Sequence, residues 1–214
     1  IGNTFNVQTG GAVSVGTMAN AWGTNTTVDG TLTVSGTWTA STNRTTDTFA
    51  GSGTINLGAL TLGNATTGLN YTGTGTINVS GNVTVASNGA SGAPFYTQSS
   101  GSLNATGMLL GDNVTNTAGS RTFNLSGGRV NLGSGGIAST GTTTATRAVN
   151  LGAGTLGASA NWSSSLAMTL TSATPGATIN TLDSVDNTTA RTITLSGILS
   201  GTGGLNKAAD GTLI

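Results

Sequence analysis

The sequence predicts an all-β chain folded as a parallel β-helix, and three observations carry this prediction. A short phrase in which asparagine stands between two apolar residues recurs between glycines. Its copies lie 22, 26 and 27 residues apart, counted between the anchors Ile55, Ile77, Leu103 and Val130. Apolar and polar residues alternate with the strand period of two, without a sustained helical stripe. A repeat this short cannot bury its own apolar face, so successive copies must stack.

Each copy divides into two or three short alternating runs separated by glycine or a polar cluster. The clearest copies place these runs at 69–71, 77–79 and 83–85, and then at 95–97, 103–105 and 108–110. We therefore expect a single domain over residues 1–214, with about nine rungs of 19–27 residues and three short strands in each rung. With rungs about 4.8 Å apart, the rod would be about 40 Å long.

Composition excludes several classes of function. Six basic and six acidic residues give zero net charge, so no basic stripe is available for nucleic acid. No apolar run approaches the ~18 residues needed to cross a bilayer, so we expect no membrane insertion. The chain has no His and no Cys, which removes Ser-His triads, disulfides and the usual zinc sites. We expect no bound metal and no cofactor.

The acidic residues do not predict a catalytic site. Asp183 and Asp186 form the one close pair in sequence, and they belong to a polar stretch that reads as an insertion loop. Glycoside hydrolysis needs two carboxyl groups at a set separation, and no register brings two Asp together from neighbouring copies. The segment 152–157 matches a dinucleotide-binding GxGxxG, but no helix follows it. We therefore expect that the chain is not an enzyme.

Asparagines recur at matching positions of the repeat. Asn56, Asn78, Asn104 and Asn131 share one position, with Asn180 a later member. Since the flanking apolar residues face inward, these side chains face outward and can hydrogen-bond along the rod, as in cross-β ladders. Their role is structural reinforcement or, alternatively, a polar face for glycans or neighbouring rods.

A second series of asparagines occupies another position of the repeat. It consists of Asn70, Asn124 and Asn150, and we expect Tyr96 to interrupt it.

Three arginines follow polar stretches of the sequence. Arg121, Arg147 and Arg191 are 26 and 44 residues apart, which corresponds to one coil and then two. The preceding stretches, including 184–190, are expected to project from a single corner. The arginines would then form either a ligand-binding ridge or a corner where each packs over the turn and meets a nearby Asp.

Both ends of the sequence read as strands without a capping segment. The apolar residues expected at the two exposed faces are Ile1, Phe5, Val7, Leu205, Leu213 and Ile214. Natural solenoids cover their open edges with caps, charges or proline. Two explanations remain open: a piece of a longer solenoid, or subunits that stack end to end.

Residues 195–213 resemble the autotransporter-associated β-strand repeat. The matching residues are Ser200-Gly201-Thr202-Gly203-Gly204-Leu205-Asn206-Lys207, followed by a turn and Gly211-Thr212-Leu213. Ala209 stands where that family has a glycine. The resemblance covers about twenty residues and implies a right-handed parallel β-helix, export to the cell surface or beyond, and an adhesive or structural role. It implies no catalytic residue.

These observations predict a secreted structural protein whose subunits stack head-to-tail into an extracellular filament or matrix fibre. Its first partner would be a second copy of itself, and an extracellular polysaccharide is a further candidate. The sequence starts at Ile1 without Met, so we expect a signal peptide outside this chain. The alternatives are a monomeric adhesin segment of an autotransporter-like passenger and a glycan-binding β-helix. A membrane barrel encoded after Ile214 would favour the first alternative, and a polysaccharide array would reveal the second.

Overall fold

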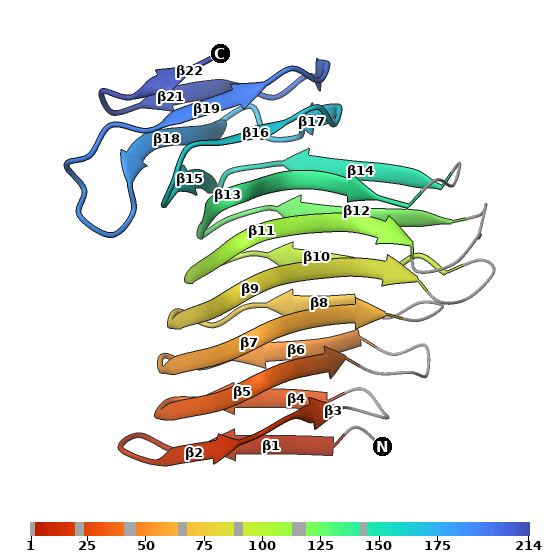
Figure 1. Ribbon diagram of the computed structural model, residues 1–214, viewed down its shortest axis with the longest axis vertical. Helices are drawn as coiled ribbons and strands as arrows, with labels where there is room; N and C mark the ends of the chain where they lie inside the picture. Colours follow the sequence, from red (N-terminus) through yellow and green to blue (C-terminus); the bar gives the residue numbers. More distant parts are fainter. Residues whose placement is uncertain are drawn as a thin grey trace.

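A computed structural model describes residues 3–19, 24–40, 46–63, 68–87, 92–112, 119–141 and 145–214. These residues form an all-β parallel β-helix, which confirms the predicted fold class. Every strand pairing in its three sheets is parallel, and the one isolated antiparallel bridge joins Leu182 to Ala190. Successive coils are stacked along one axis, with the N-terminal coil at one end and the C-terminal coil at the other (Figure 1).

Two long sheets and one short sheet make up the solenoid. Sheet A contains, in spatial order, β1 (Asn3–Val7), β4 (Thr24–Val28), β6 (Thr46–Ala50), β8 (Gly68–Tyr71), β10 (Phe95–Gln98), β12 (Ser120–Leu125), β14 (Thr146–Leu151), β17 (Met168–Leu170) and β20 (Leu199–Gly201). Sheet B contains β2 (Ala12–Val15), β5 (Thr31–Ala40), β7 (Thr54–Gly63), β9 (Thr76–Ser87), β11 (Ser102–Asp112), β13 (Arg129–Thr140), β15 (Thr155–Ala158), β18 (Ala177–Asp183) and β21 (Leu205–Ala208), with β3 (Met18–Ala19) beside β5. Sheet C contains β16 (Trp162–Ser164), β19 (Thr192–Leu195) and β22 (Thr212–Leu213).

Each coil passes from a strand of sheet A through a tight corner into a strand of sheet B. Glycines stack at this corner because the coils approach too closely for a side chain. A Cβ on Gly53 would lie 2.1 Å from the carbonyl oxygen of Gly30, and one on Gly75 would lie 2.0 Å from that of Gly53. The glycines of the repeated phrase therefore allow the close approach of successive coils, which backbone hydrogen bonds hold together at this corner.

The predicted count of rungs and of strands in each rung is wrong. The regular solenoid has about seven turns, from β1 to β15, and the shorter strands from β17 to β22 continue it. Its middle coils contain two strands, because β5, β7, β9, β11 and β13 are single strands of 10 to 12 residues. The runs 77–79 and 83–85, expected as separate strands, both belong to β9. A shift in register, such as that between Leu57 and Leu60, bends the strand without a turn.

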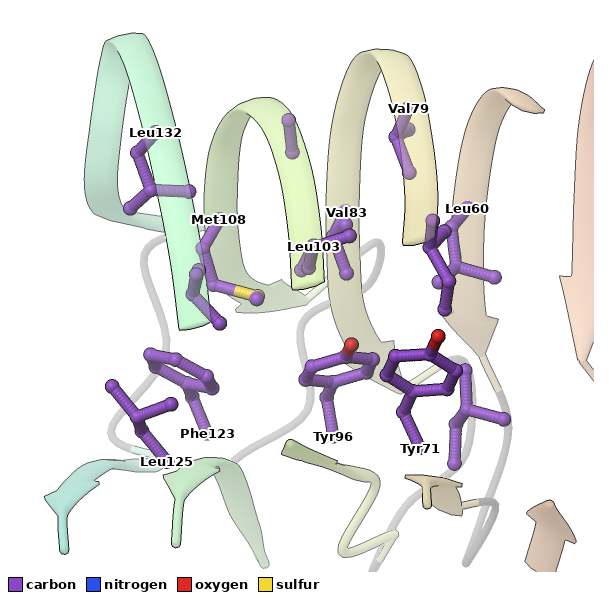
Figure 2. Packing of buried hydrophobic residues seen from close by; sticks show 14 of the residues in the cluster. Leu60, Tyr71, Val79, Val83, Tyr96, Leu103, Met108, Phe123, Leu125 and Leu132 are labelled. Carbon is purple, nitrogen blue, oxygen red and sulfur yellow. The ribbon is translucent and has the colours of Figure 1, made fainter. Parts of the chain in front are cut away.

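The core is a column of apolar side chains between the facing sheets. Figure 2 shows the rings of Tyr71, Tyr96 and Phe123 in a row, facing aliphatic side chains that include Leu60 and Met108. The ring centroids of Tyr96 and Phe123 are 6.2 Å apart. Burial raises the pKa of Tyr71 to about 12, and burial followed by the charge of Tyr71 raises that of Tyr96 well above its ordinary value. Both phenols are therefore held in the neutral form.

The position of Tyr96 differs from the prediction. Its register partners are Leu69 and Phe123, so it lies in the core and does not interrupt the second asparagine series. Thr97 is the residue paired with both Asn70 and Asn124. The hydroxyl of Tyr96 donates a hydrogen bond of 2.5 Å to Oε1 of Gln98, which satisfies a buried polar group.

Candidate functional site

The first asparagine series forms a continuous ladder on the outer face of sheet B. Strand register pairs Asn56 with Asn78, Asn78 with Asn104, and Asn104 with Asn131. Each later Nδ2 donates to the Oδ1 of the coil before, at 3.0, 2.9 and 2.8 Å in turn. All amides therefore point the same way, and their hydrogen bonds polarise one another along the rod.

An arginine caps the ladder at its C-terminal end. The next ladder position is Gly157, where an added Cβ would lie 2.3 Å from Oδ1 of Asn131. Arg129 fills this side, and its Nε donates a 2.7 Å hydrogen bond to the same oxygen. Burial lowers the pKa of Arg129 below its ordinary value. The cation thus meets the acceptor end of the polarised chain of amides.

The predicted later member of this ladder does not join it. Asn180 lies beyond a register shift between β15 and β18, and its Oδ1 accepts from the backbone N–H of Leu182. The ladder therefore ends at Asn131 and its arginine cap.

A second, shorter ladder runs along the outer face of sheet A. Nδ2 of Asn150 donates to Oδ1 of Asn124 at 2.8 Å, and Nδ2 of Asn124 donates to the hydroxyl of Thr97 at 3.2 Å. Asn70 is in register with Thr97 but makes no ladder hydrogen bond. The two faces of the rod are thus reinforced to different degrees.

A groove of about 900 Å³ runs along the first ladder, where the long strands bend. Its lining comes from the bends of β5, β7, β9 and β11, from β13, from residues 159–160, and from Ser184 and Val185. Asn56, Asn78 and Asn104 form part of its wall, beside a row of small Ser, Thr and Gly residues. The groove follows from the repeated bend, since each coil contributes the same concave corner.

The loop 184–190 lies at one end of this groove and presents Val185, which is 83% exposed. We expected this segment at the corner before sheet A, but it connects β18 with β19 (Figure 1). An ion pair between Asp183 and Arg191 closes its base. Burial raises the pKa of Asp183, but the hydrogen bond from the N–H of Val185 and the contact with Arg191 outweigh this and lower it. The loop is therefore pinned at its base.

The three predicted arginines do not share one corner. Arg121 and Arg147 are register partners, and both guanidinium groups bind backbone carbonyls around the ends of β11 and β13. Nη1 of Arg121 donates to the oxygen of Gly92 at 2.6 Å, and the Arg121 side chain is buried. Arg191 lies one residue before β19 of sheet C, outside the column of sheet A to which Arg121 and Arg147 belong. The packed-corner interpretation fits Arg121 and Arg147, because their guanidinium groups bind these backbone carbonyls.

The predicted end residues have different surroundings. Ile1 lies outside the described residues. Phe5, Leu205 and Leu213 are half-buried at the terminal coils, Val7 is buried against the next coil, and Ile214 is 68% exposed.

Three further Asp side chains of the described residues each bind a different group. Asp47 is buried and accepts the backbone N–H of Thr24 at 2.7 Å, while Asp29 accepts the N–H of Ser52 at 2.9 Å. Asp186 accepts the N–H groups of Thr188 and Thr189, each at 2.8 Å. Hydrogen bonds from the Thr189 side chain and from these two amides lower the pKa of Asp186.

Within the described ranges, no three His, Cys, Asp or Glu side chains come together as metal ligands. None of the same residues forms a helix long and apolar enough to cross a bilayer. No protein-family model, curated protein or solved structure matches the chain.

Proposed function

We propose that this chain is a secreted structural protein whose solenoid subunits stack head-to-tail into an extracellular filament. This proposal rests on the observation that most of the exposed large apolar side chains lie in the first and last coils. Among the described residues, the exposed large apolar side chains are Val15 in the first coil, Ile198, Leu199 and Ile214 in the last, and Val185 beside the groove.

The strand edges at the two ends are compatible with each other. In sheet B, the carbonyl of Gly11 accepts from Thr31 of the second coil, so the peptide groups of Ala12 and Ser14 in β2 face the free edge. At the other end, Gly204 accepts from Ala177, which leaves the peptide groups of Leu205 at the edge. Both edges run in the same direction, so a copy moved along the axis continues the parallel ladder. Contact between unlike ends gives an open filament.

Few charges oppose this contact. Residues 3–28 contain no charged side chain, and residues 192–214 contain only Lys207 and Asp210. Lys207 is in register with inward-facing Ile179, and an inward lysine is a known protection of sheet edges. Its Nζ reaches the carbonyl of Ala209 at the rim, so stacking covers the aliphatic stem without burying the ammonium group.

Sedimentation velocity over a range of protein concentrations tests the proposal. We expect larger species as the concentration rises, and Val15→Lys and Ile214→Lys should each shift assembly to at least tenfold higher concentration. Thr74→Lys adds the same charge to an exposed turn in the middle of the rod and is the matched control. Single subunits at every concentration, or equal effects of all three substitutions, would overturn it.

A second candidate function is a monomeric adhesin segment of an autotransporter-like passenger. The conformation of Ala209 supports it, since its φ of 69° is the backbone geometry that favours the glycine of the resembling repeat. This proposal includes a right-handed winding of the solenoid, which the resemblance to that repeat implies. In that case further coils of the same chain would cover the terminal edges, and Val15→Lys would leave a monomer unchanged.

A further inference from the structure

We propose that the groove along the asparagine ladder binds an uncharged, extended polysaccharide that runs parallel to the rod axis. This proposal concerns the side of the rod and does not rest on stacking at its ends. A groove of about 900 Å³ is at the upper end of ordinary ligand sites, which span ~300–1,000 Å³. It extends over several coils, so it suits a polymer better than a compact ligand.

The absence of charged side chains from the groove lining favours an uncharged ligand. The lining consists of Asn, Ser, Thr, Gly, Ala, Val and Leu, without a charged or aromatic side chain. At its loop end, Asp183 and Arg191 pair with each other. Nothing in the lining would compensate the desolvation of carboxylate, sulfate or phosphate groups, which must be paired when removed from water.

The ladder offers hydrogen bonds at a fixed repeat. Asn78 uses one N–H and one oxygen lone pair within the ladder, which leaves a second N–H and a second lone pair for a ligand. The hydroxyls of Ser80 and Thr106 donate to carbonyls of the preceding coil, so their oxygens remain acceptors. Hydroxyl groups of sugars, which both donate and accept, match this mixture. The groups recur with each coil, about every 4.8 Å.

The ladder also lowers the cost of binding. Each amide is already held by its neighbours, so little side-chain entropy is lost when a ligand binds. Leu57, Val79 and Ala105 border the groove, but their side chains are only 3–6% exposed and belong to the core. Val185 adds an apolar contact at the loop end.

An extended peptide is a poorer occupant of this groove. Peptides that bind sheets add a strand at an edge, where backbone N–H and C=O groups are free. The groove is formed by the face of sheet B, whose backbone groups pair with neighbouring coils. The side chains alone face the ligand, and this favours a chain that is rich in hydroxyl groups.

Isothermal titration of the intact chain with soluble neutral glucans and mannans, and with polygalacturonate and heparin as charged probes, tests the inference. We expect binding of at least one neutral polymer and none of the charged ones. Thr106→Glu, which puts a charge in the groove, should weaken binding at least tenfold. Thr84→Glu puts the same charge on the outer face of β9 outside the groove, and it should leave the affinity unchanged.

Absence of binding to all neutral polymers, preference for a charged polymer, or equal effects of the two Glu variants would overturn the inference. Circular dichroism of both variants checks that the solenoid is intact. Val15→Lys separates the two proposals, because it should shift filament assembly to at least tenfold higher concentration while each subunit still binds the neutral polymer. Polysaccharide binding can therefore be measured even if the subunits do not stack, and stacking can be measured even if no polysaccharide binds.

Discussion

The middle coils, from β4 to β13, differ from the coils above them in how like residues stack. In the middle, the same residue type returns at one position, so Asn78 meets Asn56 and Asn104, and the strands of sheet B are 10 to 12 residues long. Above Asn131 the ladder position is Gly157, strands shorten to between 2 and 7 residues, and a third sheet appears. Regular stacking of identical side chains thus accompanies the regular coil, and its loss accompanies the inserted loop.

The two regions also differ in backbone strain. The described residues with positive φ other than glycine are Asn187 and Ala209, both in the upper coils. In the middle coils such positions are occupied by glycine, including Gly51 and Gly101. The upper coils should therefore open at lower free energy than the middle ones.

The largest expected effect is on the core of the middle coils. Phe123→Ala should lower the free energy of unfolding by about 3–5 kcal/mol, because a fully buried ring leaves a cavity. Leu195→Ala, in the half-buried top coil, should cost about 1–2 kcal/mol, since part of that side chain already meets water. Urea denaturation followed by circular dichroism measures both. Equal losses would show that the two regions are packed alike.

The second effect appears at high pH and comes from the two tyrosines. The neutral phenol is favoured in the fold, while unfolded tyrosines ionise near pH 10. Their stabilising contribution is therefore complete below about pH 10 and is lost as pH rises through the folded pKa, about 12 for Tyr71. The loss should reach about 2 kcal/mol, measured by denaturation at pH 9 to 12. Free titration of both phenols near pH 10 in the folded chain, seen by absorbance, would contradict this.

The third effect separates the two asparagine series. Asn104→Ala removes two ladder hydrogen bonds and leaves Asn78 Oδ1 and Asn131 Nδ2 without their partners, at a cost of about 1–2 kcal/mol. Asn70→Ala removes an outward amide that makes no ladder hydrogen bond, and its cost should stay below about 0.5 kcal/mol. Urea denaturation of the two variants provides the comparison. Similar losses would mean that the ladder does not stabilise the rod.

The smallest effect is in the upper turn. Ala209→Gly should raise the free energy of unfolding by about 1 kcal/mol, because φ of 69° is strained for alanine and free for glycine. Ala208→Gly, in neighbouring strand β21, should lower it by about 0.5–1 kcal/mol. Thermal unfolding of the two variants measures whether the stability changes have these opposite signs. A loss in both variants would rule out the left-handed turn.

The repeated phrase predicted the register of the middle coils. Because Ile55, Ile77 and Leu103 face inward at one position, the adjacent asparagines had to meet on the outer face, and their hydrogen bonds follow that register. The bends were not predictable in the same way. The residues Ser80 and Gly81 read as a turn between strands, whereas neighbouring coils hold them in one strand with a bulge.

Two further predictions, for Tyr96 and Arg191, differ from the structure because a short stretch of sequence does not show how it pairs with the neighbouring coil. Alternation within 95–97 fits either face inward, and pairing with Leu69 and Phe123 selects Tyr96 for the core. The 44-residue spacing to Arg191 suggested two coils, but two coils along sheet A lead from Val149 through Met168 to Leu199, and Arg191 lies before β19 of sheet C. The groove depends on the bends of several coils together, so no single repeat in the sequence indicates it.

Electron cryomicroscopy of the purified chain at increasing concentration tests the central claim most directly. The proposed stacking predicts unbranched filaments with strands perpendicular to the axis and a strand spacing of about 4.8 Å. The nine stacked strands of sheet A then give a subunit repeat of about 40 Å. Separate rods one subunit long at every concentration, with the exposed faces of both terminal coils in contact with solvent, would contradict it.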